Sequence, residues 1–115
     1  MTMNTSQWLV LYTKPRNEKK VANRLYESGF KVYCPTKKVE KQWSDRVKVV
    51  EEPLFSSYVF IQIAEADRQK VFAIPGVVRY LFWLGKAAVV REDEIQALQS
   101  FMNDFETSPL FVENL

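Results

Sequence analysis

The sequence predicts an α+β fold, a ferredoxin-like αβ sandwich in which helices pack on a mostly antiparallel sheet and a charged β-hairpin protrudes. Short apolar runs alternate with amphipathic helical stretches, in the order β-α-β-hairpin-β-α-β-β-α. The 115 residues suffice for one compact domain and are too few for two ordinary ones. Residues 37–50 are rich in charge and contain few large apolar side chains, so this segment is expected to project from the core.

The first third of the chain carries two strands and a helix. Residues 8–13 are a short apolar run bounded by polar residues, typical of a central strand that is buried on both faces. A proline that presets φ and a glycine that allows a left-handed stop predict a helix over residues 15–28. Residues 30–34 alternate with period two, which predicts a second strand that a proline ends.

The hairpin and the second half complete the predicted order. The hairpin arms are expected at residues 37–42 and 46–50, on either side of Trp43-Ser44-Asp45. The later elements are expected as an aromatic strand ending at residue 63, a short helix over 65–74, a strand over 77–84, an edge segment over 87–90 and an amphipathic helix from the acidic turn 92–94 to Phe105. We therefore expect one domain over residues 1–105 and the start of a linker over residues 106–115.

The strand after the hairpin has two apolar faces of different chemistry. Because alternate strand residues point to opposite sides, Val59, Ile61 and Ile63 form an aliphatic face, whereas Tyr58 and Phe60 form an aromatic face. A chain this short can lack enough helix to cover both faces. An aromatic face that is incompletely covered would serve as a docking surface for a partner, and ordinary core packing is the alternative explanation.

The residue types argue against an enzyme. Histidine is absent and Cys34 is the single cysteine, which removes the usual general base and leaves too few soft ligands for a structural zinc site. The cluster Glu92-Asp93-Glu94 could bind a hard cation, but acidic residues are also favoured in the first turn of a helix. We therefore expect no cofactor and no catalytic residue.

The sequence also predicts where the protein works. No apolar run approaches the roughly 20 residues that span a bilayer, and the first seven residues lack the pattern of a secretory signal. A single cysteine suits a reducing compartment. We expect a cytoplasmic protein that does not bind a membrane.

Charge is distributed unevenly along the chain. Residues 14–48 carry eleven Lys or Arg and four Asp or Glu, a net charge of +7, whereas residues 51–115 carry five and ten, a net charge of −5. A basic front half favours contact with a phosphate backbone, although a solvated charged surface explains the same pattern.

Three separated motifs together resemble the amino-terminal domain of NusG-type transcription elongation factors. They are the opening Trp8 with Tyr12-Thr13-Lys14-Pro15-Arg16 and Glu18, then Gly29 with Tyr33-Cys34-Pro35, and then Pro53 to Phe60. The order of the three motifs, the spacing between them and the length of the chain agree with this domain over nearly the whole sequence. The long charged hairpin and Glu52-Pro53-Leu54-Phe55 look closest to the specialised RfaH and UpxY paralogues, the latter acting on polysaccharide operons.

The resemblance implies a non-enzymatic factor that binds RNA polymerase across its DNA channel, at the β′ clamp helices and the β lobe, and suppresses pausing and termination. It implies that a KOW domain follows in the parent protein. Members of the family use an apolar patch for the clamp helices, which is matched here by Phe55, Tyr58 and Phe60 and bordered by Leu84, Ile95 and Leu98. The position that contacts the lobe is matched by Arg68, Gln69 and Lys70, without the threonine-rich version of the family.

The resemblance also implies contact with nucleic acid. Lys14 and Arg24 match positions that approach the non-template DNA strand in the specialised paralogues, and Arg16 lies beside them. Trp43 at the hairpin tip either packs back on the arm or touches polymerase or upstream DNA. Two other function classes remain open: an RNA-binding module that stacks bases on sheet aromatics, and a small-ligand sensor, for which no pocket of convergent polar groups is evident and no small-molecule substrate is expected.

Overall fold

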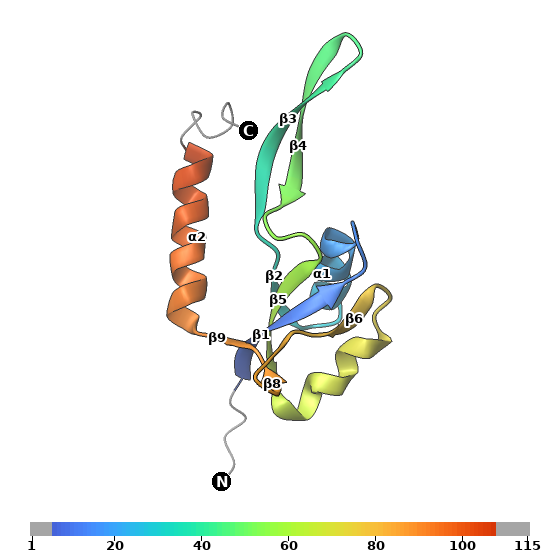
Figure 1. Cartoon of the computed structure of the whole chain (residues 1–115), viewed down its shortest axis with the longest axis vertical. Helices are drawn as coiled ribbons and strands as arrows, with labels where there is room; N and C mark the ends of the chain where they lie inside the picture. Colours follow the sequence, from blue (N-terminus) through green and yellow to red (C-terminus); the bar gives the residue numbers. More distant parts are fainter. Residues whose placement is uncertain (1–5, 108–115) are drawn as a thin grey trace.

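The computed structural model describes the backbone of residues 6–107 and the side chains of residues 6–102. The elements follow the predicted order (Figure 1). They are β1 (Ser6–Thr13), α1 (Glu18–Glu27), β2 (Lys31–Tyr33), β3 (Thr36–Trp43), β4 (Arg46–Pro53), β5 (Tyr58–Ala64), the 3₁₀-helix η1 (Glu65–Ala73), β6 (Val77–Tyr80), β7 (Phe82–Trp83), β8 (Lys86–Ala87), β9 (Val89–Val90) and α2 (Glu92–Thr107).

The central sheet has the strand order β2-β5-β1-β6, with β9 also paired to β1. Every pair in this sheet is antiparallel. Since β1 and β2 both run antiparallel to the β5 strand between them, they are parallel to each other and are joined by the crossover helix α1. This split β-α-β arrangement confirms the predicted α+β fold and its ferredoxin-like topology.

The aliphatic face of the sheet packs against α1 and η1. Its buried residues form one cluster that includes Leu9, Leu11, Val21, Leu25, Ile61, Ile63, Val71 and Tyr80. The register explains the grouping, because Leu9 lies opposite Ile61 and both point to the same side of the sheet. The prediction that Val59, Ile61 and Ile63 face the core is confirmed.

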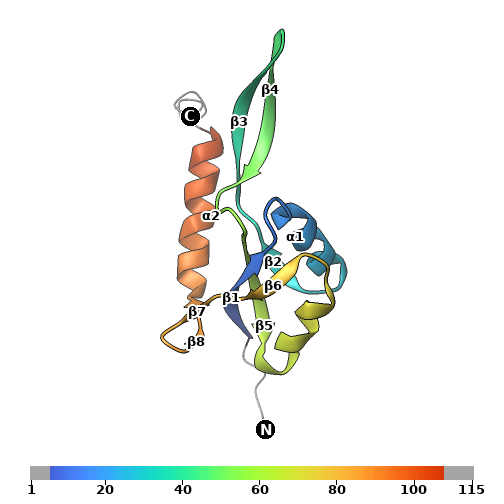
Figure 2. The same cartoon turned by 45° about the vertical axis from the view of Figure 1, so that its right-hand side comes forward.

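The aromatic face packs against α2, which stands on the side of the sheet away from α1 (Figure 2). Its buried cluster consists of Trp8, Val10, Phe60 and Ile95. Five partly buried apolar residues pack around this cluster: Tyr33, Tyr58, Leu81, Val90 and Leu98. The two faces therefore belong to two separate cores, one on each side of the sheet.

Several element boundaries differ from the prediction. The helix α1 begins at Glu18 and not at Pro15, because Arg16 adopts a left-handed φ of 64° that a helix does not accept. The predicted strand 77–84 is divided at Leu81 into β6, which pairs with β1, and β7, which pairs with β8. Leu84 and Gly85, with φ of 53° and 80°, form the turn between β7 and β8. The segment 65–74 forms a 3₁₀-helix, and the final helix ends at Thr107, two residues later than expected.

The predicted hairpin is confirmed and is longer than expected. Its strands β3 and β4 pair in continuous register from Thr36↔Pro53 to Trp43↔Arg46 and form a separate two-stranded sheet. The hairpin extends beyond the central sheet and contributes to the 59 Å length of a molecule that is 29 Å across (Figure 1). Of the predicted linker 106–115, residues 106 and 107 belong to α2 instead, and residues 108–115 lie outside the described residues.

Candidate functional site

The turn between β4 and β5 presents an aromatic surface. Phe55 is 39% exposed, and its ring meets the Phe60 ring edge-on at a centroid distance of 5.7 Å. Tyr58 is half-buried and lies 5.6 Å from the Tyr12 ring across the sheet. Of the predicted clamp-binding aromatics, Phe55 and Tyr58 thus combine exposure with a fixed ring position.

A buried carboxylate holds this turn. Ser57 has a left-handed φ of 69°, and its backbone N–H donates a hydrogen bond of 2.6 Å to Oε2 of Glu18. The carbonyl of Ser57 accepts from the N–H of Thr13 at 2.8 Å. The sequence alone does not reveal this role of Glu18, because an acidic residue in the first turn of a helix is expected to face solvent.

Phe60 does not remain incompletely covered, so that expectation is wrong. The ring is 9% exposed and belongs to the buried cluster with Trp8, Val10 and Ile95. The reason is α2, whose first turns lie on the aromatic face. Trp8 Nε1 donates a 2.8 Å hydrogen bond to Glu92 Oε1 and so fixes the start of this helix. Ile95 is therefore a core residue, whereas Leu98 is partly buried at the rim.

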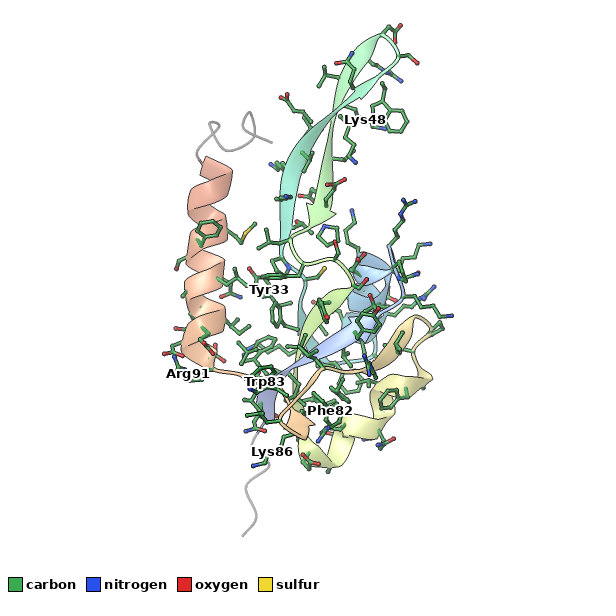
Figure 3. The ribbon with its side chains drawn as sticks, in the orientation of Figure 1. Tyr33, Lys48, Phe82, Trp83, Lys86 and Arg91 are labelled. Atoms are coloured by element: carbon green, nitrogen blue, oxygen red, sulfur yellow. The ribbon has the colours of Figure 1, made fainter. Side chains whose placement is uncertain are left out.

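Leu84 does not lie beside the other members of the predicted patch. It occupies the β7–β8 turn and is 84% exposed. The strand β9 that follows pairs with Trp8 and Leu9 near the start of β1, whereas Tyr58 pairs with Tyr12 near its end. Leu84 and the Phe55 turn are thus at opposite ends of the sheet. Phe82 and Trp83, also exposed, directly precede Leu84 and were not predicted as surface residues (Figure 3).

The predicted DNA-binding residues lie around the first helix. Lys14 and Arg24 meet at one turn, since the N–H of Lys14 donates to Gly76 O and Nη1 of Arg24 donates to Pro75 O, both at 2.9 Å. Arg16 lines a separate hollow of about 370 Å³. The other lining residues of this hollow are Glu18, Lys19, Lys20, Glu52, Pro53 and Ser56.

The residues predicted to bind the polymerase lobe differ in accessibility. Arg68 is partly buried, with its guanidinium 4.8 Å from the Tyr80 ring centroid and an ion pair to Glu65 at 3.2 Å. Tyr80 donates its hydroxyl to Arg68 O, and burial raises the pKa of Tyr80 to about 12. Arg68 thus ties η1 to β6. Gln69 and Lys70 are exposed, and Lys70 pairs with Asp67 at 2.9 Å.

The hairpin carries its basic residues mainly on one face. Paired residues of an antiparallel ladder share a face, so the register groups Lys41 and Lys48 with Trp43 and Arg46. Trp43 is 54% exposed and lines a shallow hollow at the tip that also involves Lys48 (Figure 3). Lys41 forms a 2.6 Å ion pair with Glu52, which lowers the pKa of that carboxyl.

Three further observations concern metal ligands, the cysteine and membrane spans. Between residues 6 and 102, no group of three His, Cys, Asp or Glu side chains is placed to hold a metal ion. Burial, with a smaller contribution from the Glu18 charge, raises the pKa of the Cys34 thiol to about 11, so it stays protonated at neutral pH. Within the described part of the chain, the helices are too short or too polar to span a membrane.

The comparison with known proteins identifies one family. A family model with the description "Transcription termination factor nusG" matches residues 6–99, which is most of the chain. The match begins at β1 and includes both aromatic turn residues, the hairpin and the first half of α2. A search of curated proteins found no matching relative.

Proposed function

The chain belongs to the NusG family of transcription factors, and we propose that it binds RNA polymerase through the turn that presents Phe55 and Tyr58. The clamp helices of the β′ subunit are the proposed partner at this surface, with Leu98 at its border. The β lobe is the proposed partner on the other side of the DNA channel. A domain that prefers the closed clamp shifts the clamp equilibrium by its differential affinity and thereby suppresses pausing and termination.

The observation that carries this proposal is the geometry of the Phe55 turn. An exposed aromatic ring buries about 150 to 250 Å² when a partner covers it, and it loses little conformational entropy if its position is already fixed. Phe55 meets both conditions, because its ring is exposed and is braced edge-on by the buried Phe60. A helical tip with apolar side chains fits such a surface.

The contact with the lobe is proposed for Gln69 and Lys70 on η1. Both side chains are exposed, whereas Arg68 is occupied by Glu65 and Tyr80. We therefore assign Arg68 the supporting role of holding η1 in place.

The basic surface around α1 is proposed to approach the non-template DNA strand. Lys14, Arg16 and Arg24 are exposed and belong to the segment with the net charge of +7. Lysine and arginine there supply phosphate attraction, which positions a strand without selecting its sequence. Restriction to particular operons, such as those for polysaccharide synthesis, and a following KOW domain are further parts of the proposal.

The experiment measures binding to core RNA polymerase. Phe55→Ala should weaken binding about tenfold, as expected for an aromatic anchor at an interface. Tyr26→Ala is the matched control, because Tyr26 is an exposed aromatic on α1, outside the proposed surface. Equal binding by wild type and Phe55→Ala would refute the assignment of the clamp-binding turn.

The RNA-binding alternative is weakened by the covered sheet. Base stacking on a sheet needs open aromatic rings. Phe60 is buried beneath Ile95 and cannot accept a base unless α2 moves away. Retention of single-stranded RNA in preference to polymerase would favour this alternative.

A further inference from the structure

Glu18 is the single charged side chain that the described residues bury. Burial of a carboxylate is costly unless hydrogen bonds or a cation compensate for the lost water. Among the described residues, no Lys or Arg forms an ion pair with Glu18. Its compensation comes from the 2.6 Å hydrogen bond that the backbone N–H of Ser57 donates to Oε2 of Glu18.

The Ser57 peptide depends on this bond. A serine with a φ of 69° is in a conformation that side chains with a Cβ disfavour, so the surroundings must hold it there. Glu18 binds the N–H of Ser57 and Thr13 binds its carbonyl. These two bonds set the direction in which the chain leaves the turn, and with it the positions of Phe55 and Tyr58.

The same helical turn also contacts the base of the hairpin. Lys19 Nζ donates to the backbone oxygen of Glu51 at 2.9 Å. The hollow lined by Arg16 and Glu18 continues to Glu52 and Ser56. The first turn of α1 is therefore in contact with the basic surface, the hairpin base and the aromatic turn.

We propose that Glu18 is a positioning residue for the docking surface: its carboxylate holds the Ser57 peptide and thereby presents Phe55 to an apolar helical partner. Glu18 itself does not touch the partner. This inference rests on the proposed function, because it assigns a role at the same surface.

Helix stabilisation is a competing explanation for Glu18. A negative charge in the first turn does favour a helix, and it does so from an exposed position. The helix-dipole effect requires neither burial nor a bond to a residue 39 positions away. The geometry thus favours a role in the turn.

The test compares Glu18→Ala with Glu18→Gln in two measurements, the hydrogen exchange of the Ser57 amide and the affinity for core RNA polymerase. Glu18→Ala should speed the exchange of the Ser57 amide and weaken polymerase binding about tenfold, the loss expected for a hydrogen bond to a charged group. Glu18→Gln should rescue both, because its Oε1 still accepts the Ser57 N–H. If Glu18→Ala binds polymerase as well as wild type, the inference is overturned.

Two controls separate positioning from a general loss of stability. In the Phe55→Ala background, adding Glu18→Ala should cause a smaller loss of affinity than it does in wild type, because Glu18 acts largely through Phe55. Ile63→Val removes a buried methyl group from the aliphatic face and should lower stability without changing polymerase affinity. Additive losses in the double variant, or a loss of affinity in Ile63→Val, would contradict positioning.

The failure of this inference can be told apart from the failure of the proposed function. If wild type does not bind polymerase, both the proposed function and this inference are refuted. If Phe55→Ala binds polymerase more weakly than wild type while Glu18→Ala binds as well as wild type, the inference alone is wrong.

Discussion

The two faces of the central sheet are covered to different extents. On the aliphatic face, α1 and η1 bury Val21, Leu25 and Val71 completely. On the aromatic face, α2 buries Ile95 but leaves Leu98 and Tyr58 partly exposed and Phe55 exposed at the edge. The difference leaves the first face as a sealed core, whereas the rim of the second face is accessible to the polymerase contact proposed above.

The largest expected effect concerns the centre of the aromatic face. Phe60→Asp should unfold the protein, because it places a charge among the buried apolar side chains of Trp8, Val10 and Ile95. The substitution should lower the free energy of unfolding by several kcal/mol, which is comparable with the whole stability of a small domain. Circular dichroism at 25 °C checks this result. A folded Phe60→Asp would show that α2 does not seal this part of the sheet.

A pair of leucine substitutions measures the contrast between the faces. Leu25→Ala removes a side chain that is fully buried on the aliphatic face and should cost about 3 kcal/mol. Leu98→Ala removes a partly exposed one and should cost about 1 kcal/mol, but only Leu98→Ala should weaken polymerase binding. Urea denaturation and polymerase binding together check the pair. If the two substitutions lower the free energy of unfolding equally, Leu98 is as well packed as Leu25 and the two faces do not differ in coverage.

Alkaline pH should destabilise the fold through Cys34. Its folded pKa is about 11 against an ordinary value of 9, so the folded state holds the proton more tightly. The stabilisation is complete below pH 9 and is lost as the pH rises towards 11, by about 1 kcal/mol at pH 10. Tyr80, with a raised pKa of about 12, adds a loss at still higher pH. Thermal unfolding at pH 8 and pH 10 checks the trend.

Cys34→Ala is the matched control for the pH series. It should reduce the loss between pH 8 and pH 10 relative to wild type, whatever its effect at pH 8. If Cys34→Ala and wild type lose the same stability between pH 8 and pH 10, the loss belongs to other titrating groups.

The fold was largely predictable because its signals are local. Alternation in residues 58–63, the apolar run 8–13 and the helical spacing of Ile95 and Leu98 each determine an element without knowledge of its neighbours. The division of the strand at Leu81 was not predictable, because the chain changes its pairing there from β1 to β8 and no local signal marks the change.

The candidate site was less predictable because exposure depends on tertiary packing. The alternation placed Tyr58 and Phe60 on one face but could not show that α2 covers Phe60 and leaves Phe55 accessible. Burial of Glu18 was equally hidden, since its partner Ser57 is 39 residues away in the sequence. Arg68 looked like a surface residue, and only the fold brings Tyr80 under its guanidinium.

The smallest expected effect tests how α2 is held on the aromatic face. Glu92→Ala removes the acceptor of the Trp8 indole N–H and should cost about 0.5 kcal/mol, a low value because Glu92 is exposed. Asp93→Ala is the control, since Asp93 is also a first-turn acid but pairs with the neighbouring Arg91 instead of with the sheet. If α2 is held by this bond, Glu92→Ala should also speed amide exchange in the first turns of α2 more than Asp93→Ala does. Equal exchange in the two variants would mean that the apolar packing of Ile95 and Leu98 holds the helix on the aromatic face without help from the Trp8–Glu92 bond.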